Sequence, residues 1–295
     1  MRPIFYKLRQ LFRCNQNYKH YFKSNKGVFT VIKKENTNNF IKPTVYKLNS
    51  INYGRCIEPF NENENININF NLKKITTWNV QELFWYCYKG NKINNIINHI
   101  EQFDSDVICL QEVFESYSFE LIVNNKYLKE KYPFYLTGTQ ANRFIIGENS
   151  GLLVLSKYPI KFHQFTQFDQ TTFPDILACK GALYFSVGDT NFITTHLQSE
   201  CPRIAKRQLH YILNESPFTK KTILLGDLNI DDACDELGIC NNNNMITHLW
   251  SSSKLDYILN HTNDIKFNVD VDHFSLENCS DHWPVHASFL YTNTK

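Results

Sequence analysis

Paired cysteines, nucleotide-binding glycine motifs and long apolar runs are all missing from this sequence of 295 residues. Its nine cysteines form no C-x-x-C pair, which excludes a zinc site of that kind and indicates free thiols in a reducing compartment. Neither G-x-G-x-x-G nor G-x-x-x-x-G-K-[ST] occurs, so no Rossmann or P-loop nucleotide site is predicted. No apolar run approaches the roughly 18 residues of a membrane-spanning helix. Because no signal peptide is recognisable, we expect a cytoplasmic protein.

Acidic residues are absent from the first 34 positions, which hold nine Lys and Arg. Residues 1–74 carry 14 basic and 4 acidic residues, whereas residues 75–295 carry 17 basic and 25 acidic residues. The larger part of the chain is therefore acidic, and it lacks the strongly cationic surface that binds long nucleic acids.

We expect residues 1–72 to be a basic, Asn- and Lys-rich leader, partly disordered or peripheral, and residues 73–295 to form the main domain. Near its start the leader has apolar residues at helical spacing: Ile4, Phe5, Leu8, Leu11 and Phe12. Such a segment suits an interfacial helix that makes peripheral contact with anionic lipid, an organelle transit peptide, or a solvated leader of no specific function. The residues leave these three interpretations open.

Short strand-like segments alternate with a few helical segments in the main domain. Apolar residues at i, i+3, i+4 and i+7 predict an amphipathic helix at 91–103, and further helices are expected near 115–130 and 203–214. Strands are expected at Lys74–Val80, Asp106–Leu110, Phe134–Thr137, Gly151–Ser156, Ala182–Val187, Phe192–Leu197, Thr222–Leu225, Leu255–Leu259 and Pro284–Leu290. This pattern predicts two packed sheets flanked by helices.

Polar side chains stand at six of these strand ends. They are Asn79, Glu112, His196, Asp227 with Asn229, Asp256, and Asp281 with His282. Any one of them fits a turn or a helix cap. Together they supply hard oxygen ligands and two histidines, and strand ends gathered at one edge of a sheet form a polar site on a rigid scaffold.

This set of side chains suits phosphoryl transfer to water. Carboxylate and amide oxygens without thiolates favour Mg²⁺, with Mn²⁺ as the alternative ion, over zinc. The ion would neutralise a phosphate oxygen, a base would remove a proton from water, and another group would stabilise the leaving oxygen. A histidine base needs an orienting carboxylate, for which Asp256 and Asp281 are both candidates.

Seven motifs follow one another along the chain: TWNV (77–80), LQEVF (110–114), GLLVLSKYPI (151–160), THLQSE (195–200), GDLN (226–229), LDYIL (255–259) and SDHWPV (280–285). In this order they resemble the endonuclease/exonuclease/phosphatase superfamily, which has the fold of deoxyribonuclease I. The resemblance covers residues 75–291. It implies an α/β (α+β) fold, a four-layer sandwich of two mainly antiparallel sheets flanked by helices. It also implies that residues 73–295 are the catalytic domain of a metal-dependent phosphodiesterase.

Within the superfamily, the motifs KYPF (131–134) and CKGALY (179–184) resemble neutral sphingomyelinases of the bacterial type. This resemblance implies hydrolysis of a phospholipid head group, from sphingomyelin to ceramide and phosphocholine. Glu112 would bind Mg²⁺ with Asn79 beside it, and Asp281 would complete the metal end of the site.

The resemblance implies further roles for the residues around the scissile phosphate. Asp227 and Asn229 would contact the phosphate and the attacking water. His196 would donate to a phosphoryl oxygen or to the leaving group. His282 would be the general base or would orient the water, with Asp256 holding its ring. The division of acid and base roles between Asp227 and His282 stays open.

At some positions this chain lacks the residues that are typical of other branches of the superfamily. Gln81 stands where abasic-site endonucleases carry Asp, and Ile230 and Tyr257 stand where inositol phosphatases carry other signatures. No aromatic-rich hairpin lies between LDYIL and SDHWPV, so the membrane-docking insertion of secreted sphingomyelinases is missing. For a lipid substrate, the leader or Phe168–Phe173 would do the docking.

Two alternatives remain from the sequence. A DNA or RNA endonuclease, or a DNA-end phosphodiesterase, would use the basic leader to bind nucleic acid. An inactive scaffold of the same fold would bind proteins, although no obligate protein partner is evident. The other histidines are expected to be surface or packing residues, with His248 and His273 flanking the motif loops.

Overall fold

The structure is a computed structural model that describes residues 45–47, 71–83, 91–138, 149–237, 245–276 and 278–291. These residues belong to the second of two compact units, Ile41–Lys295. The predicted helix near the start of the leader lies outside the described residues. Within the described part, no helix has the length and apolar character needed to cross a membrane.

Two sheets form the centre of the described unit. The seven-stranded sheet has the order β1 (Val45–Lys47), β4 (Phe134–Thr137), β5 (Leu153–Ser156), β3 (Val107–Val113), β2 (Lys74–Glu82), β12 (Val285–Phe289) and β11 (Phe267–Val271). The five-stranded sheet has the order β10 (Asp256–Asn260), β9 (Thr222–Asp227), β8 (Thr190–His196), β7 (Gly181–Val187) and β6 (Ile160–Gln167). Only β2 with β3 and β8 with β9 pair in parallel among these strands.

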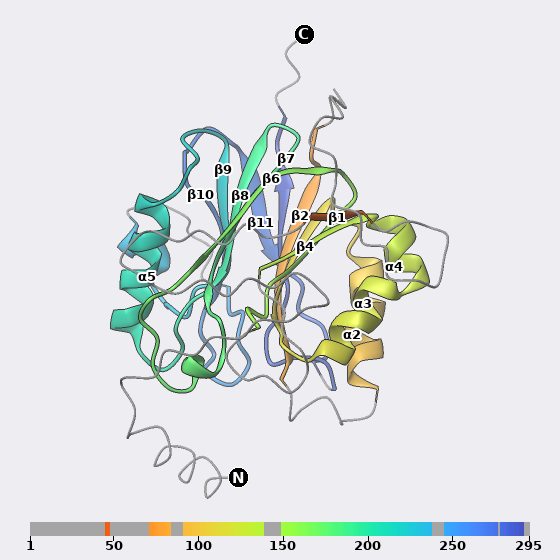
Figure 1. Cartoon of the computed structure of the whole chain (residues 1–295), viewed down its shortest axis with the longest axis horizontal. Coiled ribbons are helices and arrows are strands. Elements are labelled where there is room, and N and C mark those ends of the chain that lie inside the picture. Colours follow the sequence, from red (N-terminus) through yellow and green to blue (C-terminus); the bar gives the residue numbers. More distant parts are fainter. Residues whose placement is uncertain are drawn as a thin grey trace, which may run out of the picture. The chain divides into compact units, whose positions relative to one another are not determined.

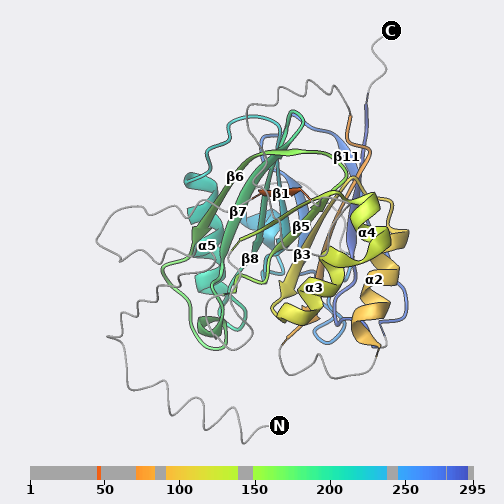
Figure 2. The same cartoon turned by 45° about the vertical axis from the view of Figure 1, so that its right-hand side comes forward.

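Helices cover the outer face of each sheet (Figure 1). On the seven-stranded sheet lie α2 (Lys92–Gln102), α3 (Ser116–Asn124) and α4 (Lys126–Lys131), and on the five-stranded sheet lies α5 (Pro202–Asn214). Two short elements, η1 (Asp175–Leu177) and α6 (Ala233–Glu236), complete the described helices. The turned view in Figure 2 shows the same layers, and they confirm the predicted four-layer sandwich.

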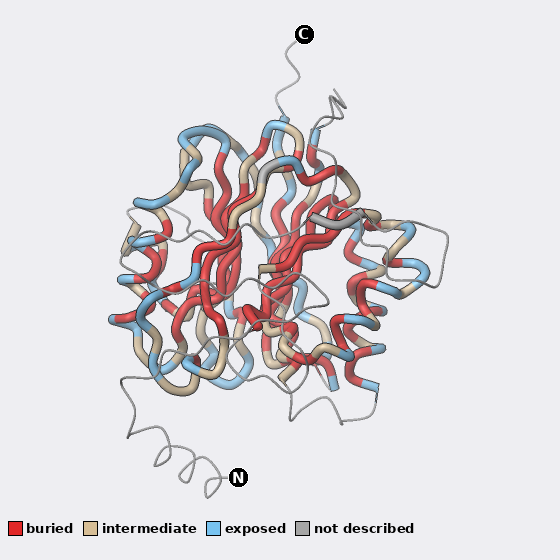
Figure 3. The backbone as a smooth tube through the Cα atoms, in the orientation of Figure 1, coloured by how far each residue is buried: buried red, intermediate tan, exposed pale blue. Residues whose placement is uncertain are grey.

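Most residues of the central strands are buried (Figure 3), and apolar side chains form the clusters between the layers. Ile75 and Val107 of one sheet share a buried cluster with Leu183 and Phe185 of the other. On the outer side, the predicted isoleucine face of α2 packs on the seven-stranded sheet. Each fully buried aliphatic or aromatic side chain of this size contributes about 1.5–3 kcal/mol. The sandwich is therefore a firm support for side chains at the strand ends.

Several elements differ from the prediction. Strands β6 and β11 were not expected, and the helix near 115–130 is two helices that break at Asn125. The Asn125 side chain accepts hydrogen bonds from the backbone N–H groups of Tyr127 and Leu128, which starts a new helix there. Strand β1 lies within the segment assigned to the leader and pairs with β4 at the sheet edge.

Candidate active site

The seven-stranded sheet places Asn79 and Glu112 at the same edge. Asn79 lies in β2 opposite Gln111 of the parallel strand β3, and Glu112 follows Gln111 directly. Glu112 has a φ of 59°, in the left-handed region that non-glycine residues seldom occupy. Such strained positions cluster at functional sites. The two predicted metal ligands thus lie next to each other near the carboxyl ends of parallel strands.

The five-stranded sheet contributes three more predicted residues. His196 ends β8 and pairs with Asp227, which ends the parallel strand β9. On the other side of β9, Asp227 pairs with Asp256, the first residue of the antiparallel strand β10. Three neighbouring strands therefore place one imidazole and two carboxyl groups in a row.

Gly226 lets the backbones of β8 and β9 approach closely just before this row. Its φ is 140°, and a Cβ atom built there would lie 2.0 Å from the carbonyl oxygen of Thr195. Only glycine tolerates this conformation and this contact. Gly226 therefore fixes the relative positions of His196 and Asp227.

His282 and Asp256 form a buried pair. The Nδ1 atom of His282 lies 2.7 Å from Oδ2 of Asp256, and the backbone N–H of His282 donates to Ser280 Oγ at 3.1 Å. Because Asp256 engages Nδ1, the Nε2 atom faces the rest of the site. It lies 3.8 Å from Oδ2 of Asp227 and 3.9 Å from Oδ1 of Asp281.

Asp227 is the shared neighbour of the other site residues. Its Oδ2 atom accepts a hydrogen bond from Asn79 Nδ2 at 3.0 Å and lies 3.5 Å from His196 Nε2, while its Oδ1 atom accepts from the backbone N–H of Asn229 at 3.0 Å. Burial raises the pKa of Asp227 to about 6, and the negative charge of Asp256 adds to this effect.

Glu112 approaches the same nitrogen of His196, with its Oε1 atom at 3.7 Å from Nε2. Burial raises the pKa of Glu112 to about 7; the positive charge of Lys180 opposes the shift and the negative charge of Asp281 adds to it. Loss of contact with water is thus the main reason why the pKa values of both carboxyl groups are raised.

The two imidazoles respond differently to this environment. Burial, together with the positive charges of Lys180 and His282, holds the pKa of His196 well below its usual value, so this ring is neutral. Burial also opposes a charge on His282, but Asp256 and the other site carboxylates outweigh it and raise the pKa of His282 to about 10. His282 therefore carries a proton at neutral pH when no cation offsets these carboxylates.

Gln81 and His248 hold Asp281 in place, and neither was assigned a role from the sequence. The side-chain amide of Gln81 donates to Oδ2 of Asp281, and Nε2 of His248 lies 3.7 Å from the same oxygen. Although burial opposes it, the nearby His248 ring and the charge of His282 hold the pKa of Asp281 below its usual value. The position of His248 beside a motif loop was the one signal for it.

Lys180 is a third residue that the prediction omitted. Its side chain is buried, with Nζ at 2.8 Å from Oδ1 of Asp175 and at 3.0 Å from the Leu197 carbonyl oxygen, to which it donates. Its charge acts on both Glu112 and Asp227. The available signal was a lysine within the otherwise apolar run ACKGAL, because a buried lysine needs a partner.

The donor atoms fit a hard divalent cation. Among the described residues, two sets of possible ligand atoms each lie within 4.8 Å of one another: Asp227, Asp256 and His282, and His248, Asp281 and His282. The buried Oδ1 atom of Asp256 has no hydrogen-bond partner among the described residues. A cation among these oxygens would stabilise the ionised carboxylates, which burial disfavours. All eight predicted site residues lie in this one region.

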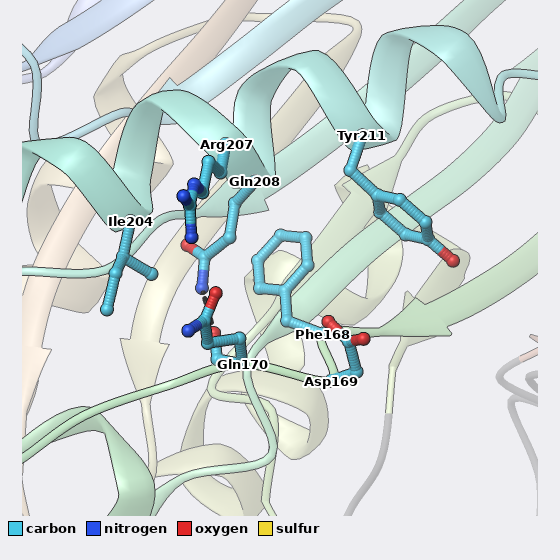
Figure 4. A pocket seen from close by; sticks show the side chains of 7 residues that line it. All are labelled: Phe168, Asp169, Gln170, Ile204, Arg207, Gln208 and Tyr211. Atoms are coloured by element: carbon cyan, nitrogen blue, oxygen red, sulfur yellow. Dashed lines mark hydrogen bonds between the residues drawn. The ribbon is translucent and has the colours of Figure 1, made fainter.

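A separate pocket of about 190 Å³ lies between α5 and the segment after β6 (Figure 4). Its lining is formed by Phe168, Asp169, Gln170, Ile204, Arg207, Gln208 and Tyr211, and includes none of the predicted site residues. In Figure 4 the Gln208 amide reaches across to the Gln170 carbonyl oxygen, at 2.8 Å. Phe168 is 5% exposed, so it offers no free apolar surface for docking.

Known proteins resemble this chain in sequence or in fold. A sphingomyelinase from Dictyostelium discoideum is 28% identical over 172 residues, which are 43% of this chain and 37% of that protein; the match thus spans under half of the relative's length.

Solved structures with the same fold include sphingomyelinase C from Streptomyces griseocarneus (18% identity, TM-score 0.58), the beta toxin from Staphylococcus aureus with bound magnesium ions (19%, 0.58), and D. rerio TDP2 complexed with a single strand DNA product (17%, 0.51). Each match covers 74% of this chain and 99% of the other. Residues 76–282 match the Endonuclease/Exonuclease/phosphatase family. The chain therefore belongs to this family of hydrolases that act on phosphodiester bonds.

Proposed function

We propose that this protein is a Mg²⁺-dependent phosphodiesterase that hydrolyses a phospholipid head group, releasing phosphocholine and ceramide from sphingomyelin. The observation that carries the proposal is the buried His282–Asp256 pair, 2.7 Å apart, whose free imidazole nitrogen faces the carboxyl group of Asp227. A base oriented by one carboxylate beside a cluster of oxygen donors is what hydrolysis of a phosphodiester by water requires.

Glu112, Asn79 and Asp281 are proposed to hold the metal ion, with Mg²⁺ as the ion and Mn²⁺ as the alternative. Carboxylate and amide oxygens suit these ions, and a structural neighbour, the Staphylococcus aureus beta toxin, has bound magnesium ions. When bound, the ion supplies positive charge that neutralises a phosphoryl oxygen and lowers the pKa of nearby groups.

His282 is proposed to take the proton from the attacking water on Nε2, while Asp256 holds Nδ1–H. The step forms a bond between the water oxygen and phosphorus and breaks the bond between phosphorus and the ceramide oxygen. The ceramide oxygen gains one proton, which balances the proton that the water gives to His282. Asp227, with its neighbour Asn229, orients the water and the phosphate. Because His282 acts as a base only when neutral, the reaction requires the negative charge around it to be offset.

His196 is proposed to donate a hydrogen bond to a phosphoryl oxygen. Its pKa lies well below the usual value, so at neutral pH the ring has one N–H and no charge. Among the described residues its buried Nδ1 atom has no hydrogen-bond partner. A neutral imidazole can stabilise charge that develops on an oxygen, but it does not serve as a strong proton donor.

The choice of a lipid substrate rests on two observations. A sphingomyelinase is among the proteins similar to this chain in sequence, and another is among those similar in structure. In addition, residues 75–295 hold 25 acidic and 17 basic residues, a balance that disfavours long DNA with its many phosphates and tolerates a zwitterionic head group.

Hydrolysis of detergent-dispersed sphingomyelin by the purified chain tests this function. We expect phosphocholine release with Mg²⁺, none with EDTA, and a loss of at least about 100-fold in His282→Ala. His210→Ala is the matched control, because His210 is an exposed histidine paired with Glu236. The same assay is carried out with a DNA duplex and a single-stranded oligonucleotide. Metal-dependent cleavage of these alone would show that the substrate is nucleic acid, as the likeness to TDP2 allows.

A further inference from the structure

An exposed apolar segment lies beside the site. In the loop before β10, Ile246 and Leu249 are each 41% exposed and Trp250 is 78% exposed. We name residues 246–250 the apolar loop. Single exposed apolar residues are ordinary, but three within five positions form a local cluster of the kind that marks an interaction surface.

The apolar loop is joined directly to the segments that carry the site. The backbone N–H of Leu249 donates to the Asp281 carbonyl oxygen at 2.8 Å, and that of Trp283 donates to the Thr247 carbonyl oxygen at 2.8 Å. Thr247 Oγ1 accepts from the backbone N–H of Asp256 at 3.0 Å. A surface that seats this loop would therefore hold the site at a fixed distance from it.

His248 places the same loop at the reacting groups. Its ring centroid lies 4.6 Å from that of His282, while its neighbours Thr247 and Leu249 make the bonds described above. The apolar loop thus carries both a ring that contacts the buried base and, two positions later, the indole of Trp250, which is 78% exposed.

The composition of the loop favours a zwitterionic lipid surface over nucleic acid. Residues 245–255 contain no Asp or Glu, and their one Lys or Arg is Lys254, whose Nζ lies 4.8 Å from the centre of the Tyr257 ring. Tryptophan, with an apolar body and a polar N–H, favours the membrane interface, and aliphatic side chains enter the acyl boundary. Binding of nucleic acid would instead call for cations that contact phosphates.

We infer that the apolar loop docks on a bilayer of zwitterionic phospholipid and holds the site against the head groups. The inference adds a membrane-docking element to the proposed function and rests on it for the substrate, whereas docking itself requires no turnover. It places the docking contact in another segment than Phe168–Phe173, where Phe168 is buried.

Sedimentation with sucrose-loaded vesicles of phosphatidylcholine and sphingomyelin, in EDTA to prevent turnover, tests the docking of the full chain. We expect Leu249→Ser/Trp250→Ser to reduce partitioning onto vesicles about tenfold or more, because exposed apolar area no longer enters the lipid. Trp250→Phe should retain most of the binding. Tyr127→Ser is the matched control, since Tyr127 is a 66% exposed aromatic residue on α4 and should leave binding unchanged.

Hydrolysis of bis(p-nitrophenyl) phosphate, a monomeric substrate, shows whether the double variant is intact, and we expect its turnover to stay within about twofold of the wild type. Unchanged vesicle partitioning in the double variant would overturn the inference. The inference would also be overturned if the double variant lost binding of an oligonucleotide but kept its binding to vesicles. If vesicle binding depends on the loop but no phosphocholine is released, the proposed function fails and the docking stands. If phosphocholine is released but vesicle binding ignores the loop, the function stands and the docking fails.

Discussion

The charge around a single imidazole governs the chemistry at the scale of residues. His282 is buried among carboxyl groups that raise its pKa to about 10, and the largest part of this effect that favours the charged ring comes from Asp256. A base must lose its proton before it can act, so the same carboxylate that orients the ring also keeps it protonated. Asp256 therefore affects both the rate and the pH at which hydrolysis sets in.

Replacing Asp256 with Asn separates these two effects. We expect kcat on micellar sphingomyelin with Mg²⁺ to fall at least about 100-fold, because the ring loses its orienting carboxylate. The rise of kcat with pH should also move to lower pH, because removing a negative charge lowers the pKa of His282. Asp189→Asn, at an exposed carboxylate paired with Lys221, is the control. An unchanged pH profile in Asp256→Asn would contradict the role given to this pair.

Glu112 makes a prediction for stability without metal. Its folded-state pKa of about 7 lies above the usual 4.5, so the folded state binds the proton more tightly and stability falls as pH rises from about 4.5 to 7. In EDTA, Glu112→Gln should lose less free energy of unfolding between pH 5 and 7.5 than the wild type, by on the order of 2 kcal/mol. Urea unfolding measures this difference. Equal losses in both proteins would show that Glu112 is not destabilised.

The sequence could predict that these eight residues lie together because they stand in motifs at strand ends, where local pattern and family resemblance coincide. Gln81, His248 and Lys180 were missed for a physical reason. Gln81 and Asp281 are 200 positions apart in the chain, and Lys180 acts through its charge rather than through a motif. Contacts of this kind depend on how the two sheets pack against each other, and the pattern of residues does not predict this packing.

At the scale of elements, strands with several buried apolar residues were predicted, including the edge strand β10, whereas β1, β6 and β11 were not. Strand β11 alternates between partly buried and exposed residues, and β6 is an edge strand of its sheet. Both have too few buried residues to give a strong periodic signal. Strand β1 has three residues, which is too short for any pattern to appear.

Gly226→Ala tests the close approach of β8 and β9. The added Cβ atom would meet the Thr195 carbonyl oxygen, and the φ of 140° is strained for alanine. We expect a loss of about 2–4 kcal/mol in the free energy of unfolding, with turnover reduced at least about tenfold because His196 and Asp227 shift. Gly188→Ala should cost less, since its φ of 64° is accessible to other residues. Equal losses at both glycines in urea unfolding would contradict this reading.

At the scale of the whole molecule, the layers followed from the alternation of short strands and helices, whereas the strand order did not. The chain crosses between sheets, so β2 pairs with β12 although about 200 residues separate them. The boundary between leader and catalytic domain remains a proposal, and β1 suggests that the compact unit begins before residue 72.

Removal of residues 1–40 tests whether the compact unit carries the activity alone. All eight proposed site residues lie between positions 79 and 282, and β1 stays in the shortened chain. We therefore expect Mg²⁺-dependent turnover of bis(p-nitrophenyl) phosphate within about twofold of the full chain. A large loss, in a truncated protein that unfolds at the same urea concentration, would place part of the site in the leader.

The most direct test of the metal-dependent site is phosphocholine release from sphingomyelin measured against Mg²⁺ concentration, for the wild type and Glu112→Gln. We expect wild-type turnover to rise from none in EDTA to saturation, and Glu112→Gln to need at least about tenfold more Mg²⁺ because a metal ligand has lost its charge. Turnover in EDTA, or identical Mg²⁺ dependence in both proteins, would contradict a magnesium site at Glu112.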